Sequence, residues 1–134
     1  MKLLLVISLV CVSFAFRSQV LGLGRSCQTK TPFVVTNFDV QPYPPTSGQK
    51  MLAAMSGTLS QTEFISDIAI RQNYNGGKYT TSYVDINQNC IYGQVNTFYV
   101  NITAGTQSGV YDVQVQLETK QGSAISCWDF TYHI

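Results

Sequence analysis

Residues 109–120 read GVYDVQVQLETK and alternate between apolar and polar side chains. Because successive side chains of an extended strand point to opposite sides, Tyr111, Val113, Val115 and Leu117 fall on one face. The residues between them are acids and amides, which suit water. The stretch therefore predicts a β-strand with one buried face and one hydrated face.

The same period of two recurs along the chain, whereas the period of a helix hardly appears. Residues 64–72 and 78–86 are joined by Asn75-Gly76-Gly77, which is typical of a β-hairpin turn. Further strands are expected at residues 33–40, 52–60, 95–102 and 125–134. About seven antiparallel strands with frequent turn signals predict an all-β, immunoglobulin-like sandwich.

The N-terminus predicts a secretory leader. Met1 and Lys2 precede an apolar run that ends at Phe14, and small residues around Ala15 offer a cleavage site. A second candidate site follows Gly24. The run is shorter than the ~20 residues that a membrane-spanning helix needs, so we expect residues 1–15 to be a signal peptide and residues 26–134 to form one exported domain.

The charge balance argues against nucleic acid as a partner. The formal net charge is +1, and removal of Lys2 with the leader makes the chain neutral. A neutral domain offers no basic face that could follow a phosphate backbone.

The mature chain keeps an odd number of cysteines, Cys27, Cys90 and Cys127. Three pairings are conceivable in an oxidising compartment, and each leaves one thiol. Pairing Cys27 with Cys127 would close a loop of about 100 residues, which the chain-entropy model values at up to about 4.7 kcal/mol. Cys90 then has two readings: a buried unpaired thiol, or a site of intermolecular pairing or lipidation.

The polar residues do not suggest catalysis. His133 is the only histidine and is placed on the wet side of the last strand, so neither a histidine-based triad nor a multi-histidine metal site can be assembled. Glu63, Asp67, Asp85 and Asp129 are expected singly on separate strands. We therefore expect a protein that is not an enzyme and that uses no metal or cofactor.

Asn101-Ile102-Thr103 is a glycosylation sequon. A glycosylated asparagine must face water, so Asn101 is expected to point outward. The alternation of this strand then directs Phe98, Val100 and Ile102 inward.

Several short motifs resemble the ML lipid-recognition domain, and their order covers nearly all of residues 26–134. They are Cys27, the turn Pro45-Thr46-Ser47-Gly48, the pair Ser56-Gly57, the strand opening at residues 108–113, and Ser126-Cys127-Trp128-Asp129-Phe130. The resemblance implies a disulfide between Cys27 and Cys127. The chain departs from the family at Cys90, which lacks the nearby cysteine partner of a second disulfide.

The resemblance also implies an apolar cavity between the two sheets that holds a lipid. The expected function is transfer of phosphatidylglycerol or phosphatidylinositol between membranes by a monomer that is secreted or in the endolysosomal lumen. The expected partners are a phospholipid or sterol ligand and, transiently, membranes. The expected cavity wall consists of Phe64, Ile68, Ile70, Phe98, Val100, Val113, Val115 and Trp128.

Two questions stay open at the level of sequence. The inward face of the last strand is either that of Trp128, Phe130 and Tyr132 or that of Ile125 and Cys127. The rival functions are a sterol carrier of the same fold and an adhesion or recognition module whose solid core supports protein-binding loops.

Overall fold

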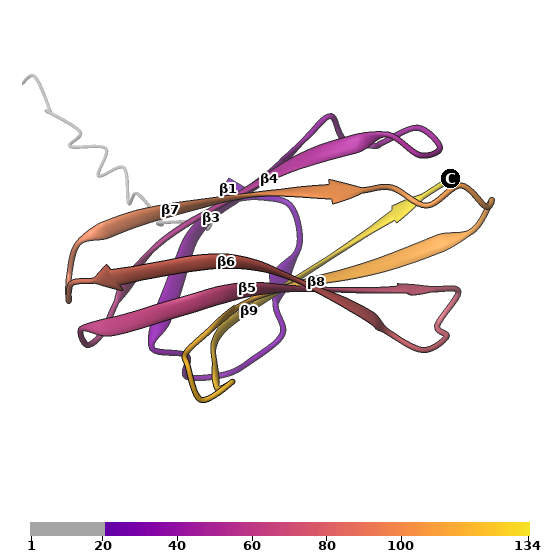
Figure 1. Ribbon diagram of the computed structural model, residues 1–134. Helices are drawn as coiled ribbons and strands as arrows, with labels where there is room; N and C mark the ends of the chain where they lie inside the picture. Colours follow the sequence, from indigo (N-terminus) through magenta and orange to yellow (C-terminus); the bar gives the residue numbers. More distant parts are fainter. Residues whose placement is uncertain (1–20) are drawn as a thin grey trace, which may run out of the picture.

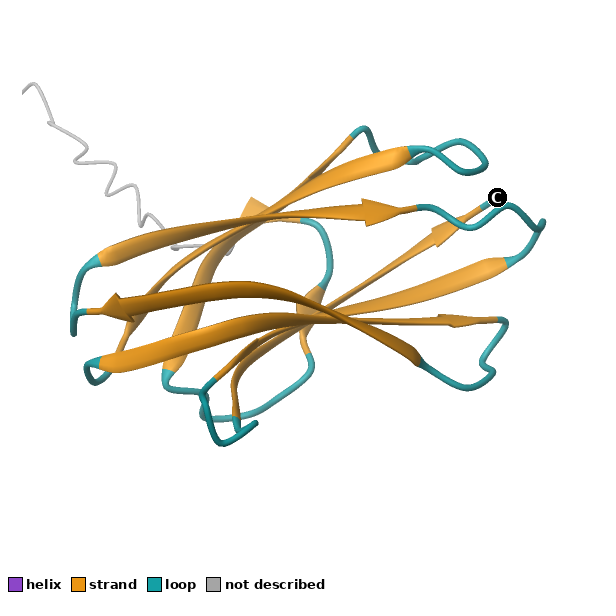
Figure 2. Ribbon diagram, in the orientation of Figure 1, coloured by secondary structure: helices purple, strands orange, loops and turns teal. Residues whose placement is uncertain are grey.

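The computed structural model describes residues 21–134, which form a sandwich of two β-sheets (Figure 1). The predicted leader at residues 1–15 lies outside the described residues. Figure 2 shows strands joined by loops and turns over the described range, without a helix. No helix long and apolar enough to cross a bilayer occurs among residues 21–134. The strands are β1 (Leu21–Gly22), β2 (Arg25–Ser26), β3 (Phe33–Gln41), β4 (Lys50–Leu59), β5 (Glu63–Tyr74), β6 (Thr80–Cys90), β7 (Val95–Thr103), β8 (Val110–Glu118) and β9 (Ala124–His133).

One sheet has the strand order β1-β3-β4-β7, and the other has the order β2-β9-β8-β5-β6. All pairs are antiparallel except β1 with β3. The seven predicted strands are confirmed as β3 to β9, and so is the all-β sandwich. β1 and β2 were not predicted, because a strand of two residues is too short to show a period.

Alternation along β7 and β8 matches the sequence pattern. Tyr111, Val113, Val115 and Leu117 are buried in β8, and the polar residues between them are half-buried on the other face. The three apolar residues predicted to point inward from β7 are buried as well. Each of these two strands, which belong to different sheets, therefore presents an apolar face to the opposite sheet.

Aromatic side chains fill much of the space between the sheets. Phe38 of β3 lies 5.8 Å from Trp128 and 5.6 Å from Phe130 of β9, measured between ring centroids. Tyr132 belongs to the same buried cluster. The inward face of β9 is therefore the one that carries Trp128, Phe130 and Tyr132, and Cys127 points to the outer face, where Gln116 Nε2 lies 3.5 Å from its sulfur.

The expectation that Phe64 points inward is wrong. The register of β5 with β6 shifts between Ile65 and Asp67, so a bulge separates two inward-facing residues, Ile65 and Ile68. Phe64, on the far side of this bulge, lies on the outer face, where the Lys120 ammonium sits 4.5 Å from the centre of its ring.

A disulfide joins Cys27 to Cys127, as the sequence resemblance implied, across a sequence separation of 100 residues. The Cys27 amide also donates to the Cys127 carbonyl at 3.0 Å. The segment that precedes β3 is thereby fastened to the last strand. Cys90 is buried and forms no disulfide within the described residues.

Loss of this disulfide should lower the stability of the sandwich strongly. We expect a reducing agent to lower the melting temperature, because the oxidised unfolded chain is constrained by a loop whose closure is worth up to about 4.7 kcal/mol. A variant with Cys27→Ser and Cys127→Ser should melt at the temperature of the reduced protein and should not respond further to reductant. Calorimetry of both proteins with and without reductant checks this, and identical melting curves for all four samples would contradict it.

Candidate functional site

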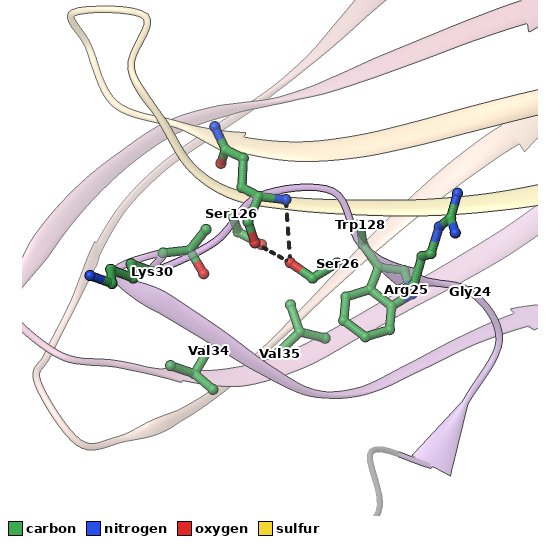
Figure 3. Close-up of a pocket in the computed structure, with 10 residues that line it drawn as sticks. Gly24, Arg25, Ser26, Lys30, Val34, Val35, Ser126 and Trp128 are labelled. Atoms are coloured by element: carbon green, nitrogen blue, oxygen red, sulfur yellow. Dashed lines mark hydrogen bonds between the residues drawn. The ribbon is translucent and has the colours of Figure 1, made fainter.

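A pocket of about 540 Å³ opens at the edge of the sandwich where β2 meets β3 and β9 (Figure 3). We call it the edge pocket. It is lined by Gly24, Arg25, Ser26, Gln28, Lys30, Thr31, Val34, Val35, Ser126 and Trp128. Its volume is within the range of ~300–1,000 Å³ that is typical of small-molecule sites.

The interior of the edge pocket is apolar and its rim is cationic. Val35 and the Trp128 indole lie together at the pocket in Figure 3, and Val34, whose side chain is on the outer face of the four-stranded sheet, lines its edge. Behind Trp128 lies Phe38, so the pocket wall is continuous with the buried core. Lys30 lies at the rim and adds a positive charge at the mouth. An apolar body with a charged or polar end fits such a site better than a uniformly polar ligand does.

One wall of the edge pocket is the segment of residues 23–27, which we call the strap. The Leu23 amide donates to the Phe38 carbonyl of β3 at 3.0 Å, and Trp128 Nε1 of β9 donates to the Leu23 carbonyl at 2.7 Å. The strap therefore connects the two sheets along this edge. Gly24 has φ +87°, and a Cβ there would lie 2.2 Å from the Asp129 carbonyl oxygen, so the close approach of the strap to β9 requires glycine.

The predicted wall residues lie in several environments. Trp128 lines the edge pocket, Ile70 lines a second pocket, and Phe64 lies on the outer face. The others are at most 4 % exposed and pack in the core between the sheets: Ile68, Phe98, Val100, Val113 and Val115. In this conformation the apolar pocket thus opens at the edge of the sandwich, and contact of these five side chains with a lipid stays a prediction.

Sequence reasoning missed the strap and the two valines of the edge pocket. In the sequence, residues 23–27 are marked only by the second candidate cleavage site, because no alternation of apolar and polar residues runs through them. Val34 and Val35 belong to an apolar run that predicts a strand but no pocket. A detectable signal was the unbroken run Phe33-Val34-Val35, because Val34 breaks the alternation by putting an apolar side chain on the outer face.

The second pocket, of about 320 Å³, lies at the opposite edge between β6 and β7. Its lining includes Ile70, Ile102 and the sequon residue Asn101, which is exposed. Val84 of β6 pairs with the buried Ile68 and so lies on the inner face, yet it is 38 % exposed. The five-stranded sheet extends beyond its partner here, so the sandwich is also open along this edge.

Carboxyl groups from neighbouring strands lie in pairs on the outer face of the five-stranded sheet, an arrangement that the sequence leaves open. Glu118 is the cross-strand partner of Asp67. Asp129 lies near Asp112, which accepts a hydrogen bond from Tyr79. Both members of the second pair line a depression of about 340 Å³ beside the strap.

The environment of Asp129 favours its neutral form. Burial, the hydrogen bond to Asp112 and the negative charge of Asp112 raise the pKa of Asp129 to about 7, and the positive charge of Arg25 on the strap opposes this shift. Two carboxyl groups in direct contact share a proton because they resist simultaneous ionisation. No cluster of three or more metal-ligating side chains occurs within residues 21–134.

The raised pKa makes stability depend on pH. Between pH 3.8 and about 7 the folded protein holds a proton on Asp129 that the unfolded chain has released. The free energy of unfolding should therefore fall as the pH rises through about 7, by about 1–3 kcal/mol. Urea denaturation at one pH below and one pH above this range measures the fall in the free energy of unfolding. Asp129→Asn should abolish it, whereas Asp39→Asn, on the exposed face of the other sheet, should keep it, and an unchanged fall in Asp129→Asn would refute the assignment.

No family model matches the chain. No curated protein matches it either. Solved structures do match. A Niemann-Pick type C2 protein from Japanese carpenter ant superposes with a TM-score of 0.63 at 8% identity, covering 84% of this chain and 98% of that one. The C-terminal domain of wzt gives 0.61 at 13% identity, covering 82% and 74%.

Chicken MD-1, solved in complex with lipid IVa, gives a TM-score of 0.56 at 14% identity and covers 80% of this chain and 84% of its own. At these identities the likeness is one of fold. It agrees with the order of motifs in the sequence and with the two-sheet architecture described above. The chain has the β-sandwich fold that these three structures share.

Proposed function

We propose that this chain is a secreted, non-enzymatic lipid-binding protein that transfers phosphatidylglycerol or phosphatidylinositol between membranes. The observation that carries the proposal is the edge pocket, whose apolar interior and cationic rim occur in an ML-type fold. Burial of a lipid tail contributes about 0.8 kcal/mol per methylene group, so a pocket of this kind can hold a lipid without catalytic chemistry. A neighbour of the same fold was solved with lipid IVa, which supports a lipid as ligand.

The cationic rim favours a phospholipid with a negative headgroup over a sterol. Lys30 and Arg25 both line the edge pocket. Both side chains are exposed. A phosphate at the mouth would interact with these cations while the tail contacts Val35 and Trp128. A sterol, which has only a hydroxyl group, would leave the two cations without a partner.

A long acyl chain needs more room than the edge pocket provides in this conformation. Trp128 separates the pocket from the core, and it contacts Phe38 at 5.8 Å between ring centroids. A deeper tail would therefore have to displace Trp128 and enter between the sheets, where Val113 and Phe98 lie. The five core residues of the predicted wall would then contact the lipid.

The structure of the strap and the disulfide are both compatible with secretion after cleavage of a leader. Cleavage after Ala15 would keep Leu23, whose carbonyl accepts the Trp128 hydrogen bond, whereas cleavage after Gly24 would remove it. We therefore propose the earlier site. The Cys27–Cys127 disulfide suits an oxidising compartment, either outside the cell or in the endolysosomal lumen.

The carboxyl-lined depression is the feature that would favour a hydrolase instead. Asp112 lies close enough to Asp129 to raise its pKa. The Asp112 carboxylate is already engaged by the Tyr79 hydroxyl, which donates a hydrogen bond to it. We therefore propose a structural role for the pair.

Lipid uptake tests the proposed function directly. The secreted protein, treated with glycosidase, should carry or load phosphatidylglycerol or phosphatidylinositol, as seen by native mass spectrometry and solvent extraction. Val34→Asp should weaken uptake about tenfold, because a carboxylate at the edge of the pocket repels an anionic headgroup and removes apolar contact with the tail. Leu52→Asp is the matched control, since Leu52 is similarly exposed on the same sheet, and it should load normally.

The other outcomes separate the rival functions. Preferential loading with a sterol would replace the phospholipid carrier by a sterol carrier. A purified protein that contains no lipid and takes up none from vesicles would support the adhesion module.

Glycosylation of Asn101 is a separate proposal. Asn101 is exposed on β7 beside the second pocket, where a glycan could extend into water. Treatment of the secreted protein with an N-glycosidase should increase its electrophoretic mobility, and Asn101→Gln should remove that shift. A mobility that the enzyme leaves unchanged would show that the sequon is unused.

A further inference from the structure

One end of the sandwich exposes apolar side chains that the pocket does not explain. The turn between β6 and β7 lies at this end, next to the turn between β4 and β5 (Figure 1). Ile91, Tyr92 and Val95 on the first turn and the start of β7 are 52%, 66% and 72% exposed. A monomeric soluble protein has little reason to gather such side chains on a protruding turn unless they bind something.

The turn holds these side chains in a defined position. The Gly93 amide donates to the Leu59 carbonyl of β4 at 3.1 Å, and the Tyr92 amide donates to Thr62 Oγ1 at 3.1 Å. Gly93 has φ +76°, a conformation that favours glycine. The β6–β7 turn is thus fastened to the β4–β5 turn, and its apolar side chains are presented outward.

This apolar end is continuous with the edge pocket. Thr58 of β4 is the cross-strand partner of Val34 on one side and of Val95 on the other, so the three residues form a row across the outer face of the four-stranded sheet. Val34 also lines the edge pocket. A surface that touches the Ile91, Tyr92 and Val95 side chains therefore also lies beside the pocket mouth.

The charges around the apolar end fit an anionic lipid surface. Lys30 lies at the start of the chain segment that leads into β3, and Lys120 lies on the turn between β8 and β9 at the same end. Of the acids at this end, Glu63 and Glu118 are half-buried, whereas Asp85, the cross-strand partner of Asp67, is exposed but belongs to the five-stranded sheet and not to the sheet that carries Val34 and Val95. Residues 91–97 carry no charge. Tyrosine and aliphatic side chains flanked by lysines suit the interface of a bilayer that contains acidic lipids.

We propose that Ile91, Tyr92, Val95 and Val34 form the surface by which this protein docks on a phospholipid membrane, with Lys30 contacting acidic headgroups. Docking in this orientation places the mouth of the edge pocket against the bilayer, so a lipid can enter without crossing water. The inference rests on the proposed lipid-binding function and specifies where the carrier meets its membrane.

Two single variants of matched exposure test the docking surface. Tyr92→Asp alters the proposed surface, whereas Tyr83→Asp alters a tyrosine that is 63 % exposed on β6, away from this end. Flotation with vesicles of phosphatidylcholine and phosphatidylglycerol measures docking. We expect Tyr92→Asp to reduce vesicle binding and transfer between vesicles about tenfold, because a carboxylate cannot replace the inserted ring. Tyr83→Asp should bind like the parent protein.

A second readout separates docking from lipid binding. Uptake of a short-chain, monomerically dissolved phosphatidylglycerol requires the pocket but no membrane, and it should be equal in all three proteins. Vesicle binding that is unchanged in Tyr92→Asp, or that is equally weakened in Tyr83→Asp, would overturn the docking surface while leaving the carrier function intact. A parent protein that takes up no short-chain lipid but still floats with vesicles would overturn the carrier function and not the docking surface.

Discussion

The attachment of the strap to β9 is the constraint on which the functional part of this molecule depends. Cys27 is joined to Cys127 by the disulfide and by a backbone hydrogen bond, and Trp128 donates to the Leu23 carbonyl. Without these contacts, residues 23–27 would be held only by the two-residue pairing of β2 with β9 and by the hydrogen bond from the Leu23 amide to Phe38. The same contacts fix the Trp128 ring between the pocket and the core. A single short segment therefore forms one wall of the pocket, holds the Trp128 ring in place and supplies one cation of the rim.

The unequal width of the two sheets is the second determinant of the site. A sandwich of four and five strands cannot cover both edges equally. The strap closes the edge at β3 and β9, while the edge at β6 and β7 stays uncovered and leaves Val84 partly exposed. Between the two edges the aromatic residues of β3 and β9 fill the core tightly. Room for a ligand is consequently found at the rim of the sandwich, and access to the centre requires side chains such as Trp128 to move.

Sequence alone predicted the seven long strands, because each spans enough residues for a period of two to be visible. It misplaced Phe64, since a one-residue bulge reverses the facing of a strand without altering its composition. The proximity of Asp112 to Asp129 could not be predicted from the sequence either. It depends on the register of β8 and β9, in which Gln114 faces Asp129 and Asp112 faces Thr131. Residues 23–27 formed no recognisable pattern because their structure is imposed by tertiary contacts with Trp128 and Cys127.

The position of the disulfide also governs how the molecule would respond to mechanical load. Because Cys27 and Cys127 lie near the two ends of the domain, tension applied to the chain termini would pass through a covalent bond and bypass strands β3 to β8. Only the strap residues before Cys27 and the last residues of β9 lie outside this covalent circuit. While oxidised, the domain would extend by little more than those two short tails, so tension on its ends would leave the sandwich intact.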